Sequence, residues 1–311
     1  MKRWWIRPLV RLLAAVLLPI AVPAMITGLI WSLPGDPASL ICPPNVCGGT
    51  EALARRWNLD GGAMQFFFGW MRDAWSLDFG NSWRLHQGIP VLELLEESIP
   101  NTLLLILMST AMVMVGGLVA ATNVLPRKLD PILRFIGMVP ALVLALAGAA
   151  FIELTYGFDS FSSSGQWARL AVGAGVLGLA DGAFSGSVLG TRSTFETESR
   201  QRYVGIAILR GEYPLENTWP NVAPALIGQM RARIVNLLSG AVVLEVILRI
   251  NGIGDLLWGG TLRQDFGVVL AAATIFAAVS ALLLLVQAVL ETMVALHVRR
   301  APAAIAPVGG A

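Results

Sequence analysis

The sequence predicts an all-α integral membrane protein with six transmembrane helices. Of its 311 residues, 56% are hydrophobic and 14% are charged, whereas soluble domains carry about 25% charged residues. Mean hydropathy is +0.69. A helix needs about 20 mostly apolar residues to cross a hydrocarbon core. Runs of this kind cover residues 9–33, 102–125, 131–155, 167–190, 225–248 and 268–297.

The first apolar run has two interpretations. A basic start, an apolar stretch and a small-residue site near Ala24 are typical of a secretory signal peptide. The apolar run nevertheless continues to Leu33, which is longer than the usual core of a signal peptide. We therefore expect an uncleaved first span, and processing of the N-terminus stays an alternative.

The distribution of Lys and Arg predicts that both termini are cytoplasmic. Positive residues beside membrane spans remain mostly on the cytoplasmic side, and here they gather at both termini and in the second and fourth connections. Residues 156–166 contain no Lys or Arg, and residues 32–101 contain four Arg against eight Asp and Glu. The chain thus divides into the N-terminus with the first span over 1–33, an external loop region over 34–101 and a membrane-spanning core over 102–311.

The external loop region contains both cysteines of the chain, Cys42 and Cys47. Two cysteines five positions apart across a Pro-Pro turn can approach disulfide distance, and an external compartment lets the bond persist. We expect a Cys42–Cys47 disulfide, and the alternative is two free thiols. Farther along, the stretch MQFFFGWM over 64–71 is expected to form a helix that rests on the membrane surface.

The stretch GAGVLGLADGAFSGSVLG, residues 173–190, contains two overlapping glycine patterns. Its start matches the dinucleotide-binding pattern G-x-G-x-x-G, which requires a strand before it and a helix after it. An apolar run of membrane-spanning length contradicts that interpretation. From Gly178 onward a glycine recurs every fourth residue, at Gly182, Gly186 and Gly190. This spacing predicts a helix-packing seam, because small residues on one helical face let another membrane helix approach closely.

Four charged residues of the predicted spans are candidates for function: Asp181, Arg231, Arg233 and Glu245. An intramembrane carboxylate is a functional candidate, and the alternative for Asp181 is a structural carboxylate that is protonated or paired with an Arg. Asp181 and the two Arg residues have compatible depths at about 1.5 Å per helical residue, so we expect Asp181 to pair with Arg231 or Arg233. Glu245 either joins such a set or snorkels to the outer interface.

Several function classes lack their sequence signatures. No G-x-x-x-x-G-K-[ST] loop occurs, so we do not expect this chain to bind ATP phosphates in the usual way. His86 and His297 fall in different compartments by the predicted topology, which excludes a shared metal site. No nucleophile with a base partner is recognisable, and no basic stripe interleaved with aromatics indicates nucleic-acid binding. We expect no enzyme activity, no metal, no bound cofactor and no nucleic-acid partner.

The fourth connection, TRSTFETESRQRYVGIAILRGEYPLENTWPNVAP over 191–224, is the longest predicted inside loop. Tyr203 with the following Val, then Ala207-x-x-x-Gly211, then Pro224 thirteen positions later resemble the EAA loop of bacterial ABC importer permeases. In that family the loop forms a short helix, a glycine turn and a second helix, and it docks on the ATPase subunit. The resemblance therefore implies that residues 191–224 form an ATPase-coupling loop.

Further segments resemble one branch of that family, the dipeptide, oligopeptide and nickel permeases. LPGDPASL over 33–40 resembles the P-G-D-P signature of the branch, and WNLDGGAMQFFFGWMRDAWSLDFGNS over 57–82 resembles its outer G-L-D-x-P…W…D-x-G-x-S segment. SGAVVLEVILRINGIGDLLWGGTLRQDFGVV over 239–269 resembles its G-A-V-V-x-E…P-G-x-G…R-D-x-P-x-V block. These segments follow the order of the branch over nearly the whole chain.

The block over residues 249–265 has two interpretations. Its glycines, among them Gly252 and Gly254, are turn formers and favour a simple outer turn. The resemblance implies instead a partly re-entrant gate segment, in which Arg263 and Asp265 form a local pair.

The resemblance implies a function and a set of partners. The chain would be the membrane-spanning permease subunit of an ATP-driven importer for peptides or similar small solutes, located in the bacterial inner membrane. A second homologous permease subunit, two ATPase subunits that bind ATP and Mg, and an external solute-binding protein would complete the transporter. ATP binding would close the ATPases, move the coupling loop and tilt the spans so that the pathway opens alternately to each side.

Two alternatives to an active importer subunit remain. The coupling loop lacks the Glu-Ala-Ala start, and it lacks the basic and His residues that the branch usually carries near Pro220 to Pro224. A degenerate permease that acts as a scaffold would explain these departures. An ion-coupled secondary transporter or channel would use the four intramembrane charges as its coupling set. Internal inverted repeats would support that alternative, and none is recognisable.

Overall fold

The computed structural model describes residues 6–33, 37–41, 51–56, 59–121, 126–157 and 163–300. Within these ranges the regular structure is helical, and the β pairing is limited to an isolated antiparallel bridge between Asn81 and Pro90. The predicted all-α class is therefore confirmed. Cys42 and Cys47 lie outside the described residues, so their disulfide stays a prediction.

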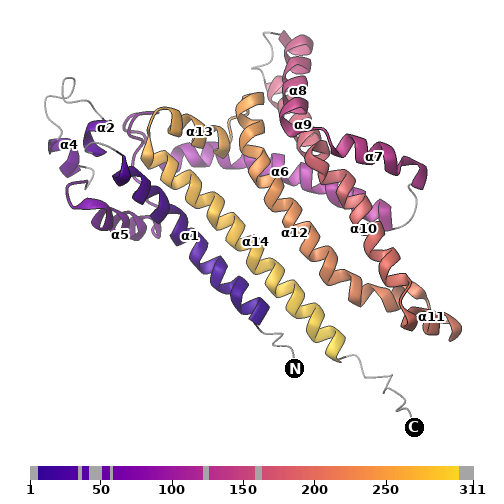
Figure 1. Cartoon of the computed structure of the whole chain (residues 1–311). Coiled ribbons are helices and arrows are strands. Elements are labelled where there is room, and N and C mark those ends of the chain that lie inside the picture. Colours follow the sequence, from indigo (N-terminus) through magenta and orange to yellow (C-terminus); the bar gives the residue numbers. More distant parts are fainter. Residues whose placement is uncertain are drawn as a thin grey trace.

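The first helix, α1 (Ile6–Ser32), lies along the last helix, α14 (Phe266–Arg300), as Figure 1 shows. Large apolar side chains on the outer side of α1 are exposed, among them Leu13 and Leu29, which is the pattern of a surface that faces lipid. The described residues that follow form the short helices α2 (Pro37–Ile41) and α4 (Glu51–Arg56) and the longer α5 (Gly62–Ala74).

The helix α5 packs one face on the rest of the protein and exposes the other. Phe66 is buried, and its ring centroid lies 5.2 Å from that of Trp31 and 6.3 Å from that of Trp83. Met64 and Phe68 are exposed on the opposite face. The predicted helix over 64–71 is present, and its location on a membrane surface stays a prediction.

The helix α6 (Val91–Ala121) begins well before residue 102, where the sequence predicted the second span to start. The early turns carry Glu93, Glu96 and Glu97, whose side chains are exposed. These charges end the apolar run in the sequence but not the helix, because they lie on the solvent side of its first turns. The predicted external region therefore ends in the first turns of a long helix.

The predicted third span over 131–155 is not a single straight helix. The chain forms the 3₁₀ turn η1 (Arg127–Leu129) and the helix α7 (Asp130–Gly137), and after a bend of 86° it continues as α8 (Ala141–Tyr156). Pro140 stands directly before α8, where a missing N–H and a fixed φ are compatible with a helix start but not with a continuing helix. The sequence prediction overlooked this break.

The predicted fourth span is also interrupted. The helices α9 (Ser163–Leu179) and α10 (Ala183–Ser199) are joined by the 3₁₀ turn η3 (Ala180–Gly182). The short helix α11 (Arg202–Leu209) follows, and α12 (Pro214–Leu248) runs back through the bundle. The predicted loop over 191–224 is therefore mostly helical, because α10 and α12 both extend past the apolar runs.

The helix α13 (Ile253–Leu262) follows α12 after a bend of 70° and leads into α14. Among the described residues, four helical segments are long and apolar enough to cross a membrane if α9 and α10 count as one segment (Ser164–Ser199), and the number rises to six if each of the two bent pairs is one span. The predicted count of six spans therefore depends on how the bent pairs lie in the membrane.

The main core lies between α6, α8, α9 and α12, where apolar side chains such as Leu105, Ala145 and Leu244 are fully buried. A second core joins the first turns of α6 to α13 and α14, with Val91, Leu95 and Val268 among its buried residues. In Figure 1 the start of α1, the end of α14 and the helix α11 lie toward one end of the molecule, and α2, α4 and α13 lie toward the opposite end.

Candidate functional site

The candidate site is the junction around α13, where the chain leaves α12 and enters α14. The two turns each contain a non-glycine residue with a left-handed backbone, Arg249 (φ 53) before α13 and Gln264 (φ 58) after it. This conformation costs about 1–2 kcal/mol for such residues, so other bonds must stabilise both turns. The 70° bend is compatible with both predicted interpretations, a simple outer turn and a partly re-entrant segment.

Glu245 bonds the start of α13 through a fully buried carboxylate. Its Oε1 accepts a hydrogen bond from Thr102 Oγ1 at 2.7 Å, and its Oε2 accepts from the backbone N–H groups of Gly254 at 2.6 Å and Asp255 at 3.3 Å. Thr102 Oγ1 in turn accepts from the N–H of Ile253 at 2.8 Å. The first N–H groups of a helix lack partners within the helix and favour a negative charge. Glu245 therefore caps α13 and does not snorkel to an interface.

Gly252 and Gly254 leave room for this carboxylate. A Cβ on Gly252 would lie 2.3 Å from the carboxyl carbon of Glu245, and a Cβ on Gly254 would lie 2.5 Å from Val242 Cα. Gly252 has φ −119, which any residue adopts. The sequence pattern marked these glycines as turn formers, but what the structure requires of them is the absence of a side chain.

Asp265 bonds the other end of α13 to the 82–85 segment. It is fully buried, and its Oδ2 accepts hydrogen bonds from Ser82 Oγ at 2.5 Å and from the backbone N–H groups of Arg84 and Leu85 at 2.9 Å each. Its Oδ1 accepts from the N–H of Val268 at 3.3 Å, in the first turn of α14. One carboxylate thus joins the start of α14 to the 82–85 segment, which lies about 180 positions earlier in the sequence.

The predicted local pair between Arg263 and Asp265 is wrong. Arg263 has an exposed side chain, and its Nη1 donates to the carbonyl oxygen of Leu85 at 3.5 Å. Asp265 points into the protein because the donors of the 82–85 segment surround its carboxylate. The sequence could not show this, because those donors lie about 180 positions away and two of them are backbone groups.

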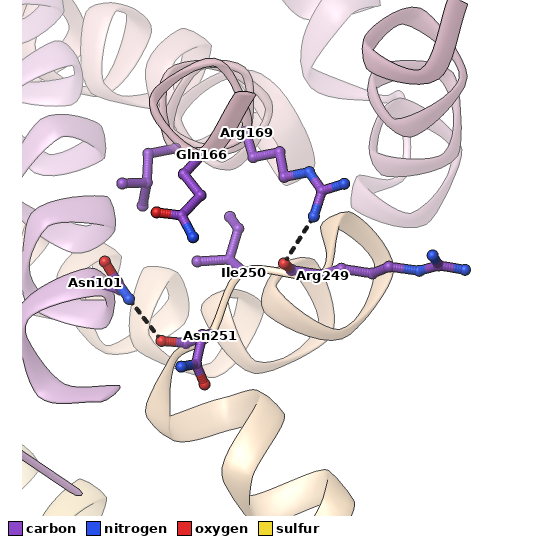
Figure 2. A pocket seen from close by; sticks show the side chains of 7 residues that line it. Asn101, Gln166, Arg169, Arg249, Ile250 and Asn251 are labelled. Carbon is purple, nitrogen blue, oxygen red and sulfur yellow. Dashed lines mark hydrogen bonds between the residues drawn. The ribbon is translucent and has the colours of Figure 1, made fainter. Parts of the chain in front are cut away.

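A pocket lies beside the turn between α12 and α13, and Figure 2 shows its lining. Asn101 Nδ2 donates to the carbonyl oxygen of Asn251 at 2.7 Å, and Arg169 Nη1 donates to that of Arg249 at 3.2 Å. Arg169 is buried, and its guanidinium lies 3.6 Å from the carboxylate of Glu153. These bonds stabilise the left-handed turn at Arg249. The lining residues are Asn101, Gln166, Arg169, Leu170, Arg249, Ile250 and Asn251.

The predicted coupling residues around Gly211 form a compact element at the opposite end of the molecule. Gly211 has φ +80 and ends α11, and the N–H of Glu212 donates to the carbonyl oxygen of Ala207 at 3.0 Å. This is the hydrogen bond of a Schellman motif, in which glycine takes the left-handed position. Ala207 is buried, as a close contact between helices requires. Pro224, in contrast, lies inside α12 and not at the end of a loop.

Tyr203 joins α11 to both neighbouring helices. Its hydroxyl donates to Glu198 of α10 and accepts a hydrogen bond from Asn221 Nδ2 of α12 at 2.9 Å. Partial burial raises the pKa of the Tyr203 hydroxyl above its usual range, and the hydrogen bond to Glu198 raises the pKa further. Leu209 and Tyr213 are 88% and 75% exposed at the tip of this element. The end of α11 and the turn after it therefore present apolar side chains outward.

The predicted ion pair between Asp181 and Arg231 or Arg233 is wrong. Asp181 Oδ1 accepts a hydrogen bond from the N–H of Ala141 at 3.2 Å, at the start of α8. Arg233 Nη1 donates to the carbonyl oxygen of Gly182 at 3.2 Å and to that of the next residue at 3.0 Å. Within the described ranges, Arg231 forms no ion pair either. Asp181 and Arg233 thus bond backbone groups at helix breaks and do not bond each other.

The predicted seam of four glycines on one helical face is also wrong. Asp181 (φ 49) and Gly182 (φ 72) have left-handed backbones, so the helix does not continue between the earlier and the later glycines. The close approach expected for small residues is present, but the neighbours differ: α6 lies against the first glycine and α12 against the last two. An added Cβ would come within 3.0 Å of a neighbouring side chain at Gly178, Gly186 and Gly190.

Three residues of the candidate site were not predicted from the sequence: Ser82, Thr102 and Arg169. Arg169 lies inside the predicted span over 167–190, and a charge within an apolar run is a signal for a structural or functional role. Thr102 starts a predicted span directly after Asn101, which is a weaker signal. Ser82 is the serine of the D-x-G-x-S motif that ends the segment over 57–82, and this motif was the signal that could have marked it.

The chain is similar to known proteins over most of its length. Residues 112–296 match the family described as binding-protein-dependent transport system inner membrane component. The chain is 25% identical over 266 residues to the oligopeptide transport system permease protein AppB of Bacillus subtilis (strain 168), in a match that covers 78% of this chain and 83% of that protein. The family match includes α11, Glu245 and Asp265, whereas Ser82 and Thr102 lie before it.

Proposed function

Because the chain belongs to the family of binding-protein-dependent transport system inner membrane components, we propose that it is the permease subunit of an ATP-driven importer for peptides or similar small solutes. The assignment of peptides rests on the name of the similar oligopeptide permease. In this proposal the chain crosses the inner membrane six times, with each bent pair of helices as one span. Both termini and α11 lie on the cytoplasmic side, as the distribution of Lys and Arg indicates.

The observation that carries the proposal is the position and surface of α11. The helix lies at the same end of the molecule as the start of α1 and the end of α14 (Figure 1). Leu209 and Tyr213 are strongly exposed there and stand beside Arg210 and Glu212. Apolar side chains that gather on an exposed element, with polar residues at the rim, mark a surface for a protein partner. This partner is an ATPase subunit that binds ATP and Mg.

The full transporter contains two such ATPase subunits, a second homologous permease subunit and an external solute-binding protein. Closure of the ATPases on ATP displaces α11. The helix α12 is continuous over 35 residues, a length of about 50 Å at helical rise, and it joins α11 to Glu245 and α13. A displacement at the inner end therefore reaches the outer junction through one rigid element.

An ion-coupled transporter receives less support from the geometry. The intramembrane charges lie in separate environments: Asp181 at the start of α8, Arg233 at the break before α10 and Glu245 at the start of α13. Asp181 and Glu245 accept from N–H groups that a helix start leaves without partners, whereas Arg233 donates to carbonyl oxygens at the break before α10. A coupling ion needs several such groups to converge on one site, and these do not.

Co-purification and uptake test the proposed function together. The tagged full chain is extracted from its native membrane in mild detergent, and associated proteins are identified by mass. The proposal expects ATPase subunits and a second permease, and ATP-dependent uptake of labelled peptide after reconstitution into vesicles. Uptake that follows an ion gradient without ATP would contradict it in favour of the ion-coupled alternative. Association with ATPases without any uptake would favour the degenerate scaffold.

A further inference from the structure

The geometry points to a substrate subsite in the pocket beside the turn between α12 and α13, where the backbone amide groups of a short peptide bind. This inference rests on the proposed function, because it assigns ligand chemistry to one place on the transport pathway. The pocket is formed by residues of α6, of α9 and of the turn (Figure 2). It lies beside α13, at the end of the molecule opposite α11, which is the external end in the proposed topology.

The chemistry of the lining indicates an amide ligand. Gln166 and Asn251 each carry a side-chain amide with an N–H₂ donor and a carbonyl acceptor. Both residues are exposed, and within the described ranges neither side-chain amide makes a hydrogen bond to the protein. A peptide group likewise presents one N–H donor and one C=O acceptor. A side-chain amide can therefore both donate a hydrogen bond to a peptide C=O and accept one from a peptide N–H. A site with donors alone or acceptors alone can make only one of these two bonds.

The charges of the pocket favour a neutral polar group over an isolated anion. The guanidinium of Arg169 already donates to the carbonyl oxygen of Arg249 and lies beside the carboxylate of Glu153. In Figure 2 the side chain of Arg249 extends away from the other lining residues. Leu170 and Ile250 supply an apolar part of the lining. A small peptide side chain fits such a surface, and its backbone amides meet the polar groups.

Because of the position of the pocket, a bound ligand affects the junction around α13. A ligand there contacts α9 on one side and the turn at Asn251 on the other. The same turn is bonded to the end of α12, since the N–H of Ile250 donates to the carbonyl oxygen of Glu245 at 2.9 Å. If the turn moves relative to α9, the two walls separate and the ligand loses contacts. Binding therefore favours the arrangement seen here over one with the turn displaced.

Direct binding to the full chain in lipid nanodiscs tests the subsite. The probe is trialanine, titrated against the wild type and the Gln166→Leu variant, which removes the amide and keeps a similar volume. We expect saturable binding that is about tenfold weaker in the variant, the loss of one or two hydrogen bonds. Gln87→Leu is the matched control, because Gln87 is also exposed in the same proposed compartment but does not line the pocket. Its binding should equal that of the wild type.

A second probe separates amide recognition from other causes of weak binding. Trialanine with methylated backbone nitrogens lacks the N–H donors, so the wild type should bind it about tenfold more weakly than trialanine, and Gln166→Leu should discriminate less. Equal affinity of the wild type for both probes, or no saturable binding of trialanine, overturns the subsite.

If Gln166→Leu fails to fold, the two probes are compared on the wild type and on Asn251→Ala, and that comparison decides. Unchanged ATP-dependent uptake by a folded Gln166→Leu transporter overturns the subsite and leaves the proposed function standing, whereas absent uptake by the wild type overturns the function itself.

Discussion

The short helices α13 and α11 lie at opposite ends of the protein and are stabilised in opposite ways. Both are joined to α12, and both adjoin left-handed turns (Figure 1). At α13 the left-handed residues are Arg249 and Gln264, and the buried carboxylates Glu245 and Asp265 bond the helix start and the following turn. At α11 the left-handed residue is Gly211, which adopts this conformation without strain.

The difference assigns different tasks to the two helices. A strained turn persists only where surrounding bonds over-determine it, so the junction at α13 is built to keep one arrangement until a force acts on it. At α11 the hydrogen bonds of Tyr203 are partly exposed, and Leu209 and Tyr213 point outward. This surface is therefore suited to binding a partner. In the proposed function, the junction around α13 thus resists movement, and α11 is where the ATPase applies it.

The largest effect is expected from a substitution that breaks the junction around α13 at Glu245. Replacing Glu245 with Ala leaves Thr102 Oγ1 and the N–H groups of Gly254 and Asp255 without their acceptor. We expect the free energy of unfolding in detergent to fall by about 3 kcal/mol or more, because buried donors lose their partners. Denaturant titration of the purified chain measures it.

The matched control is Glu96→Ala, since Glu96 is an exposed glutamate on α6. A surface change of this kind should alter the free energy of unfolding by less than about 0.5 kcal/mol. Equal losses in the two variants would show that the carboxylate of Glu245 does not stabilise the junction.

A smaller effect is expected at Asp265. The variant Asp265→Asn keeps the size of the side chain but turns one acceptor into a donor. In one orientation of the amide this donor faces the N–H of Val268, and in the other it faces Ser82 and the N–H groups of Arg84 and Leu85. We expect the free energy of unfolding to fall by about 1–3 kcal/mol and limited proteolysis to cut the 82–85 segment faster. Arg263→Gln should change neither quantity, because Arg263 does not pair with Asp265. Equal loss in both variants would restore the local pair that the structure excludes.

The smallest effect on stability is expected at Tyr203 of α11. Tyr203→Phe removes a hydroxyl that bonds Glu198 and Asn221, so we expect a loss of about 1 kcal/mol. Because the pKa of Tyr203 is raised in the folded protein, its contribution is fully present below the ordinary tyrosine pKa of about 10 and is lost as pH rises through the raised pKa. The difference in unfolding free energy between wild type and variant should shrink at strongly alkaline pH. A constant difference would exclude this bond as its source.

The sequence allowed prediction of those features that depend on local pattern. The apolar runs predicted the helices, and the resemblance around Ala207 and Gly211 implied the short helix and its glycine turn. Contacts between distant segments were mostly wrong or missed, as the partners of Asp181 and Asp265 show. In both cases the carboxylate bonds backbone N–H groups, which every residue except proline carries. A charge pattern suggests other charges as partners, and it cannot reveal a backbone partner in another segment.

The helix breaks were missed for a related reason. An apolar run looks the same whether its helix is straight or bent, so the 86° bend before α8 was not visible in hydropathy. Pro140 was a local signal for it. At Asp181 and Gly182 the signal was weaker, because glycine is common in membrane helices that remain continuous.

The most direct test of the central claim compares one substitution at two glycines of the coupling element. Gly211→Ala forces an alanine into a left-handed turn (φ +80), whereas Gly205→Ala adds a methyl group inside α11 in open space. ATP hydrolysis by the assembled transporter, measured with and without trialanine, reports whether the ATPases still sense the permease. We expect Gly211→Ala to abolish the stimulation by substrate and Gly205→Ala to preserve it. Full stimulation in both variants would contradict the claim that α11 and its glycine turn couple this chain to an ATPase.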